Sequence, residues 1–327
     1  MLDKTDTRRF QELNRAYNAV FRPGCLSIGL VVPLDAYGHD PVPDLTRHIE
    51  RVQLAERLGF SALWLRDVPF NVPSFGDAGQ VFDPFVYLGA LSMATRNIAL
   101  GVASMVLPLR HPAHVAKAAA SADALSGGRL LLGIASGDRP EEYPALNMTF
   151  PDRGARFRDS VDYIRAMAES YPRIATAQGT LTGGIDMLPK PTAGVLPLLI
   201  TGGSQQSTEW VARNGDGWMT YPRDAAAQGR VVADYRRQIA EAGLSDKPVM
   251  QSLYVDLVEQ PDAPPRPIHL GFRSGTVFLQ RYLAELRDLG INHVALNLRF
   301  NGADIEDTMH RLAEALLPAF PNAEEQP

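Results

Sequence analysis

Cysteine and long apolar stretches are nearly absent from this sequence of 327 residues. Its single cysteine, Cys25, excludes a disulfide bond within the chain and is typical of a reducing compartment, so we expect a cytoplasmic protein. No apolar stretch approaches the roughly 20 residues that a membrane-spanning helix needs, so no membrane association is expected. Apolar residues recur at helical spacing near the N-terminus and predict an outer helix, not a signal peptide; they are Phe10, Leu13, Tyr17 and Val20.

Positive charge is not in excess either. The 32 basic and 37 acidic residues give a net charge of -5, which provides no broad attraction to a phosphate backbone and argues against nucleic acid as a partner. The sequence also lacks the G-x-S-x-G, H-E-x-x-H and P-loop motifs. His39 and His111 each lie near a predicted loop without a second histidine at metal-ligand spacing, so no metal site is expected.

What the sequence does contain is an alternation of two kinds of segment. Short apolar segments, often β-branched, predict eight buried strands at residues 26–32, 62–65, 98–104, 130–134, 198–201, 217–220, 249–257 and 293–298. Helical patterns separate these segments, and one apolar stripe closes at Gly59. Alternating strands and helices predict an α/β fold with a parallel sheet, and eight units favour a closed (β/α)₈ TIM barrel over an open, doubly wound sheet.

The expected domain organisation follows from this pattern. We expect an N-terminal outer helix and lead-in at residues 1–24, a single barrel domain at 25–320 and a polar tail at 321–327. Long insertions rich in proline, glycine and threonine are expected after strand four, at 137–152 and 171–197, and a proline-rich one after strand seven, at 260–269. Loops of this length often cover a binding site.

The residues that follow the barrel strands are the first candidates for a site, because barrel enzymes act at the carboxyl ends of their strands. Arg66 and Asp67 follow the second strand and would orient or protonate a substrate. An ion pair at the barrel rim explains them equally well. Trp218, inside the sixth strand, would form the floor under a flat ring or simply pack in the core.

The TGGSQQS segment at residues 201–207 joins the fifth strand to a helix. Gly202 and Gly203 allow close backbone approach, and Ser204 would cap the helix, so this turn suits a phosphate group. An ordinary glycine turn with a serine cap is the alternative. A barrel enzyme without a metal or an activated serine would rely on an organic cofactor for its chemistry, and the turn fits that idea.

Four segments together resemble the luciferase-like monooxygenase family: LAERLGFSALWLRD, ALGVASMVLPLRHPAHVAKAAASADALSGGRLLLGIASGD, RGARFRDSVDYI and TGGSQQSTEWVARNGDGWMTYP. The similarity resumes at LAELRDLGINHVALNLR. The resemblance implies a barrel with flavin at its C-terminal mouth, and frequently a homodimer. We therefore expect a dimer through the helices that follow strands two and three, the second of which (112–125) is rich in alanine.

By position, the resemblance assigns the flavin phosphate to Gly202, Gly203, Ser204 and Gln205, with Ser136 and Arg139 nearby. Ala103 and Ser104 match the place where relatives often have a non-prolyl cis peptide beneath the flavin ring, and Trp218 would pack near the isoalloxazine. Relatives often carry Glu-His after strand two, whereas this chain carries Arg66 and Asp67, which argues against aldehyde oxidation with light emission. We expect Asp67 to act in the reaction in place of that histidine.

The expected function is that of an FMN-dependent monooxygenase, which uses O₂ and reduced flavin from a separate reductase on a small organic substrate. One alternative is a reductase or dehydrogenase that uses the deazaflavin coenzyme in the same pocket. The other is a flavin-binding protein without turnover.

Overall fold

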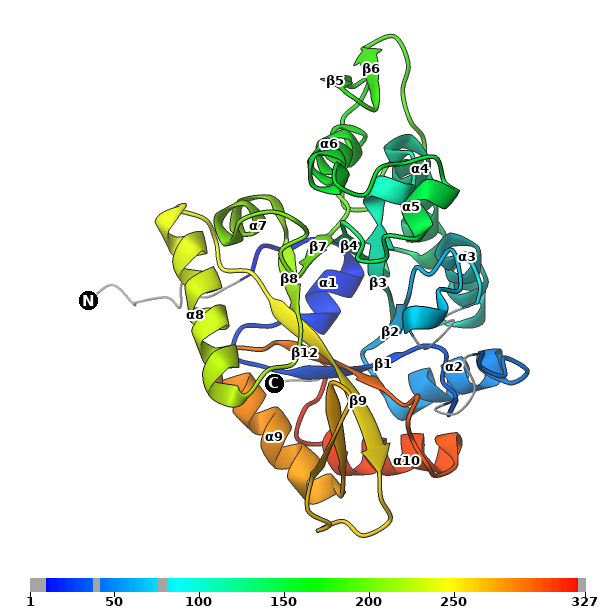
Figure 1. Ribbon diagram of the computed structural model, residues 1–327, viewed down its shortest axis with the longest axis vertical. Coiled ribbons are helices and arrows are strands. Elements are labelled where there is room, and N and C mark those ends of the chain that lie inside the picture. The colour runs from blue at the N-terminus through cyan, green and yellow to red at the C-terminus, as the bar shows by residue number, and fades with distance from the viewer. Residues whose placement is uncertain (1–9, 38–41, 76–80, 323–327) are drawn as a thin grey trace.

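The computed structural model describes residues 10–37, 42–75 and 81–322, and it forms a closed parallel barrel (Figure 1). The barrel strands, in spatial order, are β1 (Ser27–Val31), β2 (Ala62–Leu65), β3 (Ala99–Val106), β4 (Leu130–Ala135), β7 (Leu198–Thr201), β8 (Gly217–Thr220), β9 (Val249–Leu257) and β12 (His293–Asn297). The pairings β8–β9 and β12–β1 close the ring, which confirms the predicted (β/α)₈ barrel and excludes the open sheet.

Helices surround this barrel, as the apolar stripes predicted: α2 (His48–Leu58), α3 (Pro84–Ala94), α4 (Pro112–Ser126), α6 (Arg153–Ala166), α7 (Thr208–Asn214), α8 (Ala225–Glu241), α9 (Thr276–Asp288) and α10 (Ile305–Leu316). Their ends follow simple chemistry. The Asp83 carboxylate accepts the N–H groups of the first turn of α3, and Gly59 ends α2 in the left-handed conformation at φ 91°.

The first helix, α1 (Arg15–Val20), does not join the outer ring expected from its apolar spacing. It lies across the amino-terminal end of the barrel, where the Tyr17 hydroxyl donates to the carbonyl of Asp216 at 2.7 Å and the Ala16 N–H donates to that of Gly128 at 2.9 Å. Tyr17 and Val20 pack on the inward-facing residues of the strands. The barrel interior is apolar at this end, so it must be covered, and α1 covers it.

Side chains alternate between the two faces of each barrel strand, as the pleat requires. In β2, Leu63 and Leu65 pack outward against the helices, whereas Ala62 and Trp64 point into the barrel. In β8, Met219 points inward and Trp218 outward. This alternation decides which residues reach the barrel mouth.

Both long insertions contain strands that the sequence did not reveal. After β4 come α5 (Glu142–Ala145), α6 and an antiparallel hairpin of β5 (Arg173–Thr176) and β6 (Gly179–Thr182), which projects beyond α6 (Figure 1). After β9, the strands β10 (Arg266–Ile268) and β11 (Gly271–Ser274) pair with each other, and β11 extends the sheet next to β9. This second insertion therefore builds a wall at the barrel mouth.

Candidate active site

A cavity of about 810 Å³ opens at the carboxyl ends of the barrel strands. The sequence-predicted residues that line it are Arg66, Asp67, Ala103, Ser104, Ser136, Arg139, Gly202, Gly203, Ser204 and Gln205. Trp218 is the predicted residue that does not line this cavity. Segments more than 100 residues apart in the sequence thus meet at one mouth, as the barrel requires.

The Thr201–Gln205 turn forms one edge of the cavity in an unusual backbone conformation. Gly202, Ser204 and Gln205 all have positive φ values, of 53°, 45° and 62°. Within the described part of the chain, the backbone N–H groups of Gly203, Ser204 and Gln205 donate to no protein acceptor. Successive unpaired amides in such a turn form a concave group of donors that suits an anion.

Ser204 does not cap the following helix, contrary to the expectation from its sequence position. Its hydroxyl donates to the Thr201 carbonyl at 2.7 Å inside the turn, and Ser207 is the N-cap of α7, accepting the Trp210 N–H. The left-handed backbone at Ser204 and Gln205 delays the start of the helix by three residues. Ser204 therefore shapes the turn that the helix follows.

Trp218 lies outside the barrel and not beside the cavity. Its ring packs on Tyr235 of α8, with 5.0 Å between centroids, and its indole N–H donates to the Gly202 carbonyl at 2.9 Å. The alternation of β8 directs Met219, and not Trp218, to the interior. The expected contact of Trp218 with a flavin ring in the cavity does not fit this geometry; the residue supports the Gly202 turn from behind.

The floor of the cavity contains the end of β3. The Ala103–Ser104 peptide is cis, as the family resemblance implied, and it coincides with a register shift between β3 and β4. The Ser104 hydroxyl pairs with the Thr201 hydroxyl, and its oxygen lies 3.7 Å from the Met219 sulfur. The β3 floor and the Thr201–Gln205 turn are therefore in direct contact.

Asp67 is held by protein groups, in a nearly buried ion pair with Arg110. Its side chain is 1% exposed, and its carboxylate oxygens accept from Arg110 Nη2 at 2.8 Å and Nε at 3.2 Å. The Val106 N–H donates to the same carboxylate at 3.0 Å. Arg66, its neighbour, also lines the cavity.

Arg139 and Glu142 are buried polar residues that line the cavity wall after β4. The Arg139 guanidinium lies over the Phe75 ring at 4.6 Å, and neither its Nη1 nor Glu142 Oε1 has a hydrogen-bond partner among the described residues. Burial raises the pKa of Glu142, and the nearby Arg139 cation opposes this effect. Sequence reasoning missed Glu142 because it lies in the short helix α5 within the insertion.

The cavity wall opposite Arg139 and Glu142 is aromatic, and the sequence did not predict its residues either. Tyr254, His269 and Phe300 line it, and their rings contact one another across centroid distances of 5.2 to 6.5 Å. Arg299 packs between the Phe300 and Tyr37 rings, at 5.1 and 5.0 Å. Tyr254, His269 and Phe300 come from β9, from the second insertion and from the segment after β12, whereas Tyr37 follows β1.

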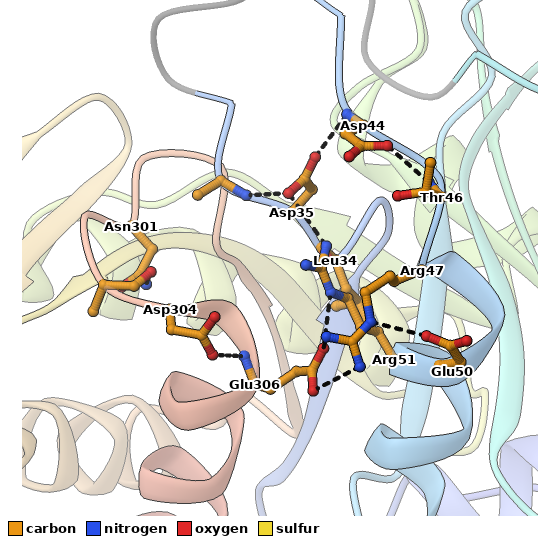
Figure 2. A network of polar contacts seen from close by, with 12 residues as sticks. Leu34, Asp35, Asp44, Thr46, Arg47, Glu50, Arg51, Asn301, Asp304 and Glu306 are labelled. Atoms are coloured by element: carbon orange, nitrogen blue, oxygen red, sulfur yellow. Dashed lines mark hydrogen bonds and ion pairs between the residues drawn. The ribbon is translucent and has the colours of Figure 1, made fainter.

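A network of charged groups anchors the segment after β1 (Figure 2). Asp35 accepts the N–H groups of Ala36 and Asp44 at 3.0 and 2.7 Å, and it forms an ion pair with Arg51 of α2 at 3.2 Å. Arg51 also contacts Glu306 of α10 at 3.5 Å. The segment that carries Tyr37 is thus fixed at its base to α2, which is itself paired with α10.

Two further expectations concern metals and membranes. His39 lies outside the described residues, and His111 caps α4 through Nδ1. In residues 10–37, 42–75 and 81–322, no three possible metal ligands lie together. No helix in these same ranges is long and apolar enough to cross a membrane.

The pattern of the luciferase-like monooxygenases matches residues 26–316. The chain belongs to this family. It is similar to the F420-dependent glucose-6-phosphate dehydrogenase of Beutenbergia cavernae (31% identical, over 51% of this chain and 49% of the relative) and to the 4-hydroxyprotoasukamycin monooxygenase of Streptomyces nodosus (27%, over 52% and 45%). The monooxygenase RslO1 of Streptomyces bottropensis has a similar fold, with a TM-score of 0.76 and 20% identity over 90% of this chain and 99% of that one.

Luciferase-like enzymes use flavin or deazaflavin cofactors, and the residues present fit the phosphate that both carry. The three unpaired amides of the Gly203–Gln205 turn would provide the donors for it. Gly202 keeps the turn compact, because a Cβ there would lie 3.3 Å from the Tyr221 ring in a left-handed conformation.

Proposed function

We propose that this luciferase-like oxidoreductase is an FMN-dependent monooxygenase that acts on a small organic substrate. The observation that carries the proposal is the left-handed turn at Gly202–Gln205, whose unpaired amides edge a cavity large enough for a cofactor and a substrate together. Reduced FMN from a separate reductase would supply two electrons to O₂, so that one oxygen atom enters the substrate and the other leaves as water.

The chain itself would bind the cofactor, orient the substrate and exclude water. The amides of Gly203, Ser204 and Gln205 would hold the phosphate, and the backbone at Ala103 and Ser104 would lie beneath the ring. Arg66 faces the cavity and would orient the substrate. The insertions after β4 and β9 wall the mouth and would limit solvent access.

Anaerobic reconstitution tests this proposal. The purified protein is titrated with FMN and, separately, with deazaflavin coenzyme F420, and each loaded form is reduced and then exposed to O₂. We expect the protein to bind FMN, and we expect the rate of O₂ consumption to rise when a small organic substrate is added. Tight FMN binding without any oxygen consumption or turnover would instead identify a flavin-binding protein.

A deazaflavin-dependent dehydrogenase is the second candidate function. It is supported by the F420-dependent relative and by a smaller cavity of about 210 Å³ on the other side of the Gly202–Gly203 turn, bordered by Arg223. The deazaflavin coenzyme continues beyond its phosphate, and this cavity would receive the extension. Oxygen-insensitive hydride transfer with bound F420 would favour this candidate over the monooxygenase.

We also propose that the protein is a homodimer paired through α3 and α4. Helix α3 contains no charged residue, and its outer face carries Val86, Ala90 and Met93 at helical spacing. Val86 and Met93 are 73% and 77% exposed in the single chain. A helix that is apolar on all sides is normally buried, so a second copy of this chain is the expected cover.

A further inference from the structure

The cavity is chemically divided into two halves. The Thr201–Gln205 turn and the cis peptide at Ala103–Ser104 lie on β7 and β3, on either side of β4. The aromatic wall of Tyr254, His269 and Phe300 rises from β9 and β12. Since β12 is four strands away from β4 in a ring of eight, the two halves face each other across the mouth.

A cofactor that joins the phosphate turn to the β3 floor would therefore occupy the first half and leave the second half open. The second half presents carbon surface to the cavity: among its rings, His269 is exposed and Tyr254 and Phe300 are partly exposed, and the neighbouring Leu270 side chain is exposed as well. A wall of partly exposed aromatic rings in a concave site is typical of ligand binding.

This wall is rigidly built. The Asp256 carboxylate pairs with Arg273 at 2.6 Å and accepts the Gly302 N–H at 3.0 Å, which ties β9 to both β11 and the segment after β12. Asn301 accepts the Leu257 N–H at 3.0 Å. These contacts hold the rings in place before a ligand binds. A flat, rigid ligand loses little conformational entropy on such a surface, so it should bind more tightly than a flexible chain.

Polar side chains also line the cavity beside the wall, among them Gln251 and Arg299. Ser252 and Asn297 line the cavity there, and the Asn297 Oδ1 accepts the Arg299 N–H at 3.0 Å, which fixes the orientation of its amide. From these observations we propose that the second half of the cavity is the substrate site and that it takes a planar aromatic compound with an oxygen substituent. This inference rests on the proposed function for the place of the cofactor.

The test compares two probes with the same carbon skeleton, planar 2-naphthol and its saturated analogue decahydro-2-naphthol. FMN-loaded protein is titrated with each probe by calorimetry, in the parent and in the variants Phe300→Leu and Tyr254→Leu. Phe278→Leu is the matched control, because Phe278 belongs to an aromatic cluster with Phe272 and Tyr282 outside the cavity.

We expect the parent to bind 2-naphthol at least about tenfold more tightly than the saturated probe. Each wall variant should lower the affinity for 2-naphthol by about 3- to 10-fold, the range that one aromatic contact contributes. The affinities for the saturated probe and for FMN should stay nearly unchanged. Phe278→Leu should change the affinity for neither probe. Equal affinities for the two probes, or unaltered 2-naphthol binding in both wall variants, would overturn the inference.

Two controls separate this inference from the proposed function. Loss of FMN in the wall variants would assign the wall to the cofactor and overturn the inference, while the flavin function would stand. If the protein never binds FMN yet binds 2-naphthol with the same dependence on Phe300 and Tyr254, the cofactor proposal fails and the aromatic site is supported.

Discussion

Arg110 donates hydrogen bonds to both carboxylate oxygens of Asp67, from Nη2 to Oδ1 at 2.8 Å and from Nε to Oδ2 at 3.2 Å. Arg110 also contacts Asp83, the cap of α3, at 3.0 Å. The pair therefore joins the end of β2 to the loop before α4 and the start of α3. With the Val106 N–H also bound, the Asp67 carboxylate is better placed to fix the cavity wall than to exchange protons with a substrate.

Replacing Asp67 should mainly cost stability. Asp67→Asn removes the buried one of the two carboxylates that pair with Arg110, so we expect a loss of about 2–3 kcal/mol in the free energy of unfolding. Arg110→Met should cost a similar amount, and the double variant should cost less than the sum. Urea denaturation measures all three. If Asp67→Asn is as stable as the parent but turnover falls about 100-fold, Asp67 is a catalytic residue after all.

The Thr201–Gln205 turn, the proposed phosphate site, should be sensitive to substitution at Gly202. Gly202→Val forces a β-branched residue into a left-handed conformation and brings its Cβ to 3.3 Å from Tyr221, so FMN affinity should fall at least about tenfold. Gly194→Val is the control, because Gly194 has φ 76° and open space around it, away from the cavity. FMN fluorescence quenching gives both affinities. Equal FMN affinity in the parent and in Gly202→Val would show that the phosphate does not bind at this turn.

His293 should make the protein less stable in acid. It is fully buried in the barrel, where Nε2 accepts the Trp64 indole N–H at 2.8 Å and Nδ1 lies 2.7 Å from the Ser27 hydroxyl. Burial lowers the pKa of His293 to about 3, while the unfolded chain titrates near 6.5.

Between these two values the unfolded state binds one more proton at this position than the folded state does. The free energy of unfolding should therefore fall as pH drops below about 6.5, by up to about 1.4 kcal/mol per pH unit from this group. His293→Gln should show a shallower dependence from pH 6 to pH 4 in urea denaturation. Identical slopes in the parent and this variant would rule out His293 as the source.

The proposed dimer should depend on the apolar face of α3. Light scattering of the parent at micromolar concentration should give twice the mass of one 35.8 kDa chain. Met93→Lys places a charge in the interface and should shift the mass towards one chain. Val277→Lys, at an exposed apolar position on α9, should leave it unchanged. A parent mass of one chain would exclude the dimer.

The sequence by itself determined the barrel and the turn at one edge of its cavity. Eight apolar segments predicted its eight strands, because buried parallel strands must be apolar on both faces. The TGGSQQS segment predicted the turn at the cavity edge, because glycine marks backbone that other residues avoid. These features are local: a few neighbouring residues specify each of them.

Only the tertiary structure decided which neighbours meet across the chain. Strand pleating sends Trp218 outward and Met219 inward, a choice that depends on the register of β8 and not on residue type. Asp67 meets Arg110 43 residues later, and Tyr254 meets Phe300 46 residues later, because the barrel brings separate strand ends together. Such contacts arise from closure of the ring, so no local pattern in the sequence encodes them.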